Sequence, residues 1–235
     1  MRTSQQLPFV FIHGAGGTGA KFRGIEERVN GAPCRVLDLP GHGQQDGTGY
    51  NSIAAYADWV NEQLGEEEVI IVGHSMGGMI GIEAAASNPN IKGLVLDASH
   101  YEMPVHPKIL EDLLAGTFPE FLFKASYGRE AKEELLAEER EQLAWVKTAV
   151  VHDDFFACNQ YKGADTFAKL AIPVLALYGA EDKLLPKGAS EKVAELNGNV
   201  QTKTIPGAGH YIMLEQPDAF AEALDAFRQS LLAKV

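Results

Sequence analysis

The feature that most constrains this chain is a turn that joins an apolar run, residues 69–72, to a helical pattern over residues 76–87. The run is mostly β-branched, which favours a buried strand, and Ser75 stands where the strand passes into the helix. Gly73 and Gly77 flank the serine, and glycine tolerates the backbone of a sharp turn. The pattern G-x-S-x-G therefore predicts a nucleophile elbow. An ordinary strand-to-helix turn with a capping serine would show the same five residues, so the prediction depends on the rest of the chain.

Apolar runs and helical patterns alternate on both sides of this turn. Further strands are predicted at residues 8–12, 35–39, 92–97, 172–178 and 201–205, and helices at residues 18–29, 53–64, 188–196 and from 217 onward. This alternation predicts an α/β protein with a mostly parallel, doubly wound sheet of about six strands and helices on both faces. Ligands of such sheets bind beyond the carboxyl ends of the strands.

The alternation stops over residues 104–165, where only helices are predicted, at residues 108–114, 119–125 and 129–151. We interpret this segment as a short helical cap on a core formed by residues 1–103 and 166–235. Its aromatic and apolar side chains are candidates for a pocket lining, although packing within the cap would explain them equally well. These side chains are Phe118, Phe121, Leu122, Phe123, Tyr127, Trp145, Phe155 and Phe156.

The composition restricts the partners and the compartment. The 235 residues carry a net charge of −12, which disfavours nucleic acids and anionic membrane surfaces. Cys34 and Cys158 have neither disulfide-framework nor zinc-site spacing, so we expect two buried thiols and a reducing compartment. No apolar run reaches membrane-spanning length. We therefore expect a cytoplasmic protein without a membrane or nucleic-acid partner; the sequence predicts no oligomeric state.

Three residues carry the candidate chemistry. Ser75, Asp182 and His210 occur in the order nucleophile, acid, base, each in a glycine-bearing loop after a predicted strand. A serine hydroxyl needs an imidazole to accept its proton, and a carboxylate holds that imidazole in the required tautomer. The negative charge that forms on an attacked carbonyl would be stabilised by the backbone N–H groups of Met76 and Ala15, with that of Gly16 as the second choice. This chemistry needs no metal ion and no cofactor.

Five segments, in order and in phase with the predicted strands, resemble the α/β-hydrolases of the esterase and lipase kind. They are residues 13–17, 38–43, 73–78, 178–182, and 209–210 with Glu215, Gln216 and Pro217 behind them. The resemblance covers nearly all of the chain and implies the α/β-hydrolase fold with Ser75, Asp182 and His210 as the catalytic triad. Sheets of this family usually have two additional N-terminal strands, which the seven residues before Pro8 cannot hold, so we expect a truncated sheet.

Each assignment has a competitor. Asp97 ends the strand at residues 92–97 and could be the catalytic acid, but the loop and the proline after Asp182 match the commoner form of the motif. We expect Asp97 to be a structural, hydrogen-bonded carboxylate. The other histidines compete with His210 for the role of base, but only His210 lies in the late glycine loop that the fold requires. These histidines are His13, His42, His74, His100, His106 and His152.

A second class of function has its own support. Residues 14–19 fit the dinucleotide-binding pattern G-x-G-x-x-G, and Asp38 ends the next strand. That hypothesis leaves the loops of Ser75, Asp182 and His210 unexplained. We therefore predict a serine carboxylesterase that hydrolyses small, short- to medium-chain esters through an acyl-enzyme. The alternatives are a thioesterase, a lactonase, a C–C hydrolase, a lyase or a binding protein on the same scaffold.

Overall fold

A single parallel sheet forms the centre of the molecule. The computed structural model describes residues 7–233. Its sheet has six strands in the order β2-β1-β3-β4-β5-β6, and every neighbouring pair is parallel. The strands are β1 (Phe9–Ile12), β2 (Cys34–Leu37), β3 (Val69–His74), β4 (Ile91–Asp97), β5 (Val174–Gly179) and β6 (Val200–Ile205). The predicted fold class and the predicted six strands are confirmed.

The strand order places a ligand crevice. The chain moves from β1 to the edge strand β2 and then returns to the other side of β1 at β3, so the direction of winding reverses between β1 and β3. Loops that leave adjacent strands in opposite directions separate and open a crevice at the carboxyl ends of those strands. Residues 13–17 follow β1 and Ser75 follows β3, so both lie at this crevice.

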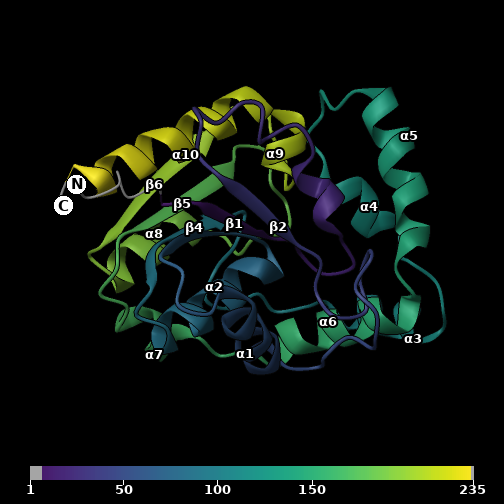
Figure 1. Ribbon diagram of the computed structural model, residues 1–235. Coiled ribbons are helices and arrows are strands. Elements are labelled where there is room, and N and C mark those ends of the chain that lie inside the picture. Colours follow the sequence, from purple (N-terminus) through teal and green to yellow (C-terminus); the bar gives the residue numbers. More distant parts are fainter. Residues whose placement is uncertain (1–6, 234–235) are drawn as a thin grey trace.

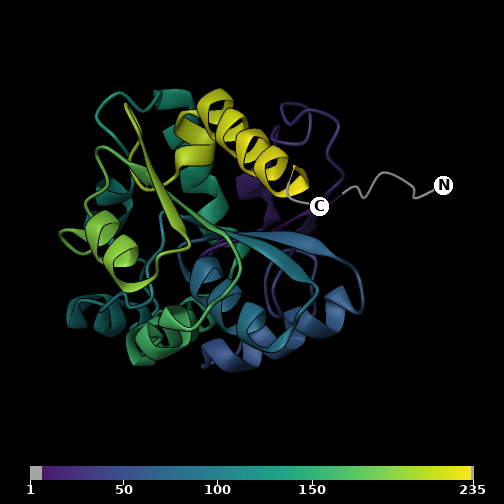
Figure 2. The same ribbon diagram turned by 90° about the vertical axis from the view of Figure 1, so that its left-hand side faces the viewer.

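Helices cover both faces of the sheet. One face is covered by α1 (Ile53–Leu64), α2 (Met76–Ser87), α7 (Ala164–Ala168) and α8 (Ala189–Leu196). The other face is covered by the 3₁₀ helix η1 (Gly19–Phe22), α9 (Ile212–Glu215) and α10 (Pro217–Leu232). Figure 1 shows α10 on one side of the sheet and α1, α2 and α7 on the other, and the turned view of Figure 2 shows the same two layers. The central strands β1, β3 and β5 are buried along their whole length because both faces are covered.

The predicted helix over residues 18–29 is wrong. Only the single turn η1 is helical there, and turns follow it. Gly24 has a φ of +74°, outside the helical region, so the backbone cannot continue as a helix beyond η1. Phe22, Ile25 and Val29 are nevertheless buried against the sheet, so their spacing indicated a core-facing segment without a continuous helix.

The four helices of the central segment gather at the carboxyl end of the sheet (Figure 1). They are α3 (Pro107–Leu114), α4 (Glu120–Ser126), α5 (Glu133–Gln142) and α6 (Thr148–Gln160), with the short 3₁₀ helix η2 (Leu143–Trp145) after α5. The prediction of one helix over residues 129–151 is wrong, because Val146 is extended and separates α5 from α6. Apolar residues of α3, α4 and α6 form a small core of their own. We keep the division into a core and a cap over residues 104–165 as a proposal.

Between residues 7 and 233, the longest and most apolar helices fall short of what a membrane span requires.

Candidate active site

Ser75 has a strained backbone at the point where β3 ends and α2 begins. Its φ of 51° and ψ of −116° are unusual for a residue with a side chain. The turn is held by a hydrogen bond from the N–H of Ser75 to the carbonyl of Asp97 at 2.9 Å, and by one from the Ser99 hydroxyl to the carbonyl of Ser75 at 2.6 Å. A Cβ at position 73 would overlap the Gly77 carbonyl, so Gly73 is required for this turn to close.

His210 and Asp182 form a buried pair. His210 Nδ1 lies 2.8 Å from Asp182 Oδ2, and the two side chains are 5% and 3% exposed. The other carboxylate oxygen accepts hydrogen bonds from the N–H groups of Leu184 at 2.7 Å and Leu185 at 3.3 Å. Burial alone would raise the pKa of Asp182, but the neighbouring His210 and these hydrogen bonds outweigh it and hold the pKa below its ordinary value. Asp182 is therefore an ionised carboxylate that orients the imidazole.

The loop that carries His210 is anchored from two sides. His74 Nε2 donates to the carbonyl of His210 at 3.0 Å. Glu215, on α9, accepts from the N–H of Gly209 at 2.9 Å and from the N–H of Gly128 at 2.7 Å. The carboxylate of Glu215 thus joins the histidine loop to the segment between α4 and α5. Sequence reasoning named Glu215 only as part of a motif and missed this role.

Asp97 does not meet the expectation of a hydrogen-bonded structural carboxylate. Its side chain is fully buried, and neither carboxylate oxygen has a hydrogen-bond partner within residues 7–233. Burial, and secondarily the charge of Asp182, raises the pKa of Asp97 well above its ordinary value. The imidazole of His210 is hydrogen bonded to Asp182 and not to Asp97, which favours Asp182 as the acid.

The first glycine loop offers one of its two candidate donors to a ligand. The N–H of Gly16 donates to Asp154 Oδ2 at 2.9 Å and is therefore occupied. Ala15 lines the cavity beside Ser75, and within the described part of the chain no hydrogen bond occupies its N–H. Met76 is the first residue of α2, so its N–H has no partner inside the helix. The arrangement favours Ala15 over Gly16, with Met76 as the second donor.

Asp38 braces this loop. Its carboxylate accepts hydrogen bonds from the N–H of Gly19 at 2.7 Å and from the N–H of Gln44 at 3.1 Å. A dinucleotide site would need an acidic residue at this place to bind a ribose hydroxyl. Here the carboxylate ties the glycine loop to the loop after β2, which argues against the dinucleotide hypothesis.

A cavity of about 340 Å³ opens above Ser75 and His210. Phe118, Phe121, Leu122 and Phe155 line it, as expected of the cap. The other aromatic candidates do not line it: Phe123 and Tyr127 pack beside α5, and Trp145 and Phe156 are 55% and 37% exposed. The lining that sequence reasoning did not anticipate comprises mainly residues 103–106, Ile109, Cys158, Lys183, Leu184 and Tyr211.

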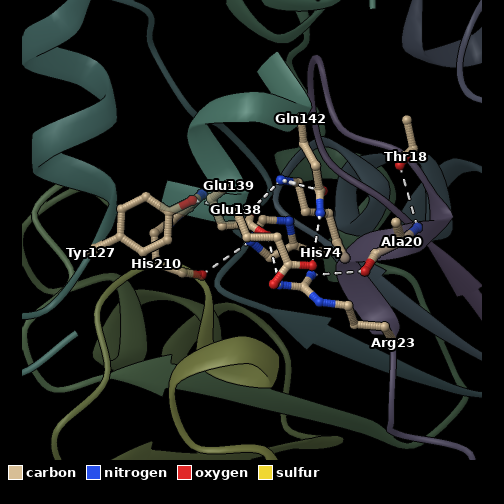
Figure 3. A network of polar contacts seen from close by, with 10 residues as sticks. Thr18, Ala20, Arg23, His74, Tyr127, Glu138, Glu139, Gln142 and His210 are labelled. Carbon is tan, nitrogen blue, oxygen red and sulfur yellow. Dashed lines mark hydrogen bonds and ion pairs between the residues drawn. The ribbon is translucent and has the colours of Figure 1, made fainter. Parts of the chain in front are cut away.

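A buried ion-pair cluster joins α5 to the core beside the site (Figure 3). Glu139 of α5 is fully buried and pairs with Lys21 of η1 and, at 2.9 Å, with Arg23. The Tyr127 hydroxyl donates to the same carboxylate at 3.2 Å. The Lys21 ammonium lies 5.3 Å from the ring centre of Tyr211, the residue after His210. The charged stretch over residues 129–140 therefore contains a carboxylate, that of Glu139, which faces inward.

Comparison with known proteins gives a family. The model of a family described as the alpha/beta hydrolase family matches residues 9–223. The pimeloyl-acyl-carrier-protein methyl ester esterase of Pectobacterium carotovorum is 30% identical over 249 residues, which cover 94% of each chain. Lipase 3 of a Moraxella species is 26% identical, over 95% of this chain and 78% of the relative.

Solved structures give the same fold. A thermophilic esterase superposes with a TM-score of 0.83 at 28% identity, over 98% of this chain and 91% of that chain. The enol-lactonase from Burkholderia xenovorans superposes with a TM-score of 0.85 at 16% identity, over 97% and 94% of the two chains. At that identity the second likeness shows the fold alone.

Proposed function

The chain belongs to the alpha/beta hydrolase family, and from this premise we propose that it is a serine carboxylesterase acting on small, short- to medium-chain esters. The observation that carries the proposal is the cavity shared by Ser75 and His210, with Asp182 hydrogen bonded to the far side of the imidazole. The names of the relatives support ester hydrolysis, because they are esterases and a lipase.

The proposed reaction has two halves. Ser75 Oγ attacks the ester carbonyl while His210 Nε2 accepts its proton, and the carbonyl oxygen becomes an oxyanion held by the N–H groups of Ala15 and Met76. The carbonyl re-forms as the alcohol leaves with the proton from His210. Water then attacks the acyl-enzyme and gives its proton to His210, which passes that proton to Ser75 Oγ as the bond from the acyl carbon to Oγ breaks and the acid leaves. Each oxyanion donor typically contributes about 3 kcal/mol of transition-state stabilisation.

The size and the lining of the cavity support a small substrate. Ligand pockets typically measure about 300–1,000 Å³, and the cavity above Ser75, at about 340 Å³, lies near the lower limit. Its lining is mostly apolar and includes Ile109, Phe118 and Leu122, so it suits the hydrocarbon part of an acyl group. Lys183 and His106 supply polar groups to the same lining.

A second candidate is the methyl ester of an acyl group held on an acyl-carrier protein. It is favoured by several relatives that carry the name pimeloyl-acyl-carrier-protein methyl ester esterase, one of them 30% identical over 94% of this chain. The two candidates share the bond and the triad and differ in the carrier. Rates measured on one methyl ester, free and bound to the carrier protein, separate the two candidates. An enzyme for free esters hydrolyses the carrier-bound ester no faster than the free one.

The decisive experiment replaces Ser75 by alanine. The variant is expected to lose p-nitrophenyl acetate and butyrate turnover to the background rate, because the attacking hydroxyl is gone, while its circular dichroism stays that of the wild type. Ser87→Ala, at the other end of α2, is the matched control and keeps wild-type turnover. Wild-type turnover by Ser75→Ala would refute the mechanism. A panel of oxygen esters, thioesters and lactones, run on the wild type, then tests the substrate class.

A further inference from the structure

One carboxylate of α6 holds the loop of the proposed oxyanion hole. Asp154 is fully buried. Its Oδ2 accepts from the N–H of Gly16 at 2.9 Å and from His42 Nε2 at 2.8 Å, and its Oδ1 accepts from the Tyr56 hydroxyl at 2.7 Å. Three donors from three separate segments, the loops after β1 and β2 and helix α1, therefore converge on one side chain.

The hydrogen bonds of His42 determine its protonation. Its Nε2 faces the carboxylate of Asp154, and its Nδ1 faces the carbonyl of Pro40 at 3.0 Å. Both partners are acceptors, so both ring nitrogens must carry a proton, and the ring is an imidazolium. The neighbouring His13 differs, because its Nε2 accepts from the N–H of Leu39 at 3.1 Å and must be unprotonated.

The surroundings agree with this assignment. Burial alone would lower the pKa of His42, but the hydrogen bond and the charge of Asp154 outweigh it and raise the pKa. The other titratable groups near the ring are the Tyr56 hydroxyl on Asp154, His13, whose ring centre lies 4.8 Å away, and Asp38 close to His13. Burial, together with the charge of His42, lowers the pKa of His13 to about 3, so His13 is neutral beside the imidazolium.

The position of Gly16 fixes that of Ala15. Gly16 has a φ of +64°, and a Cβ there would lie 2.9 Å from Val151 Cγ1 of α6. The residue is thus held by α6 through this close approach and through Asp154. Its N–H donates to the carboxylate, whereas the adjacent N–H of Ala15, at the cavity, has no partner within residues 7–233. A lone buried carboxylate beside a forming oxyanion would oppose it, and the positive charge of His42 cancels that repulsion.

We propose that the buried His42–Asp154 ion pair is a positioning element of the reaction: it holds Gly16 so that the Ala15 N–H points at the oxyanion, and it does so only while His42 keeps its proton. The inference rests on the proposed esterase function. His42 and Asp154 touch no substrate and act through the loop.

Asp154→Asn tests the role of the carboxylate. The amide has one acceptor oxygen for three donors, so the loop loses its anchor, and we expect kcat to fall about a hundredfold with KM nearly unchanged. Asp153→Asn makes the same chemical change one residue away on α6, at a side chain that is 46% exposed, and keeps the wild-type kcat. A wild-type kcat in Asp154→Asn would overturn the proposal.

Tyr56→Phe is the milder variant if Asp154→Asn does not fold. It removes one of the three hydrogen bonds to Asp154 and is expected to lower kcat a few-fold. Tyr161→Phe, which removes a hydroxyl that donates to Glu83 at 2.9 Å, is its control. Equal kcat values in the two tyrosine variants would count against the proposal.

Nitrogen-15 NMR of the histidine rings tests the protonation without any turnover. At neutral pH we expect two ring N–H signals from His42 in the wild type and in Ser75→Ala, and their loss in His42→Gln. As the pH rises through the raised pKa of His42, one signal disappears and kcat declines with it. His42→Gln lacks this alkaline decline, whereas His152→Gln, at a half-buried side chain of α6, keeps it. A singly protonated His42 ring at neutral pH would overturn the proposal.

The outcomes separate this inference from the proposed function. If the wild type hydrolyses no ester while both ring N–H signals are present, the esterase proposal fails and the ion pair remains. If the wild type is an esterase whose activity is indifferent to Asp154 and His42, the esterase proposal stands and the positioning role fails.

Discussion

Two aspartates show how surroundings decide what a side chain does. Asp97 is the last residue of β4 and Asp182 follows the neighbouring strand β5, so both lie at the carboxyl edge of the sheet. Asp182 has an imidazole and two backbone N–H groups as partners, whereas Asp97 is buried among groups that offer it none within the described chain. The pKa of Asp182 is therefore lowered and that of Asp97 is raised.

These opposite shifts predict opposite effects of the same substitution. The folded protein resists ionisation of Asp97, so the pKa of Asp97 is higher in the folded protein than its ordinary value of 3.8. The contribution of Asp97 to stability is therefore lost as the pH rises from 3.8 to the pKa of the folded state. Asp97→Asn does not ionise, so it should raise the free energy of unfolding at neutral pH, with no gain below pH 3.8, and should keep esterase activity. Urea denaturation at several pH values measures this.

Asp182→Asn should behave in the reverse way. The lowered pKa of Asp182 gives stability that is present above 3.8 and is lost as the pH falls through the folded value. The variant should therefore be less stable than the wild type at neutral pH, approach it below pH 3.8, and lose about 10⁴-fold in kcat because the imidazole loses its orienting partner. Full activity in Asp182→Asn together with its loss in Asp97→Asn would move the acid to Asp97.

At the scale of elements, the cap helices are tied to the core by buried charge. Lys21, Glu139 and Tyr127 come from η1, from α5 and from the segment after α4, and Lys21 lies over the ring of Tyr211. Figure 3 shows Glu139 beside Tyr127. Most carboxylates of α5 face solvent, but Glu139 is fully buried. Removal of one partner from a buried ion pair leaves an uncompensated charge, which makes this contact sensitive to substitution.

Glu139→Gln should destabilise the protein by about 3–5 kcal/mol, because Lys21 then stays buried without its counter-charge. Thermal unfolding of the variant, beside the exposed-site control Glu141→Gln, measures the loss. In the double variant with Lys21→Met, both charges are absent and much of the stability should return. Equal losses in Glu139→Gln and Glu141→Gln would show that the pair does not hold α5.

At the scale of the whole molecule, the net charge of −12 acts on the encounter with substrate. Long-range repulsion slows the approach of anions and is screened by salt, whereas it leaves neutral molecules unaffected. For a half-ester that carries a free carboxylate, we therefore expect kcat/KM to rise from low to physiological salt. For the corresponding neutral diester it should not change. A fall of kcat/KM with salt for the anionic ester would show that a local positive group such as Lys183 dominates the encounter.

Local pattern alone determined the sheet and the chain positions of the candidate site. The strands β1, β3, β4 and β5 are recognisable because burial on both faces demands continuous apolar runs, whereas the edge strand β6 is mostly exposed and polar. The edge strand β2 and the spacing of Ser75, Asp182 and His210 follow from the same alternation. The short helix at Gly19–Phe22 does not follow from the pattern of apolar residues, because a chain of turns buries apolar residues at this spacing as well as a helix does.

Only the tertiary structure decided which polar groups share a partner. Asp154 lies 138 residues from Gly16 and 112 from His42, and nothing in its neighbours along the chain marks it as the anchor of a loop. Asp97 and Asp182 likewise have similar sequence settings and different partners. The reason is physical: burial and hydrogen bonding depend on groups brought together by the folded sheet, whereas secondary structure depends on residues that are neighbours along the chain.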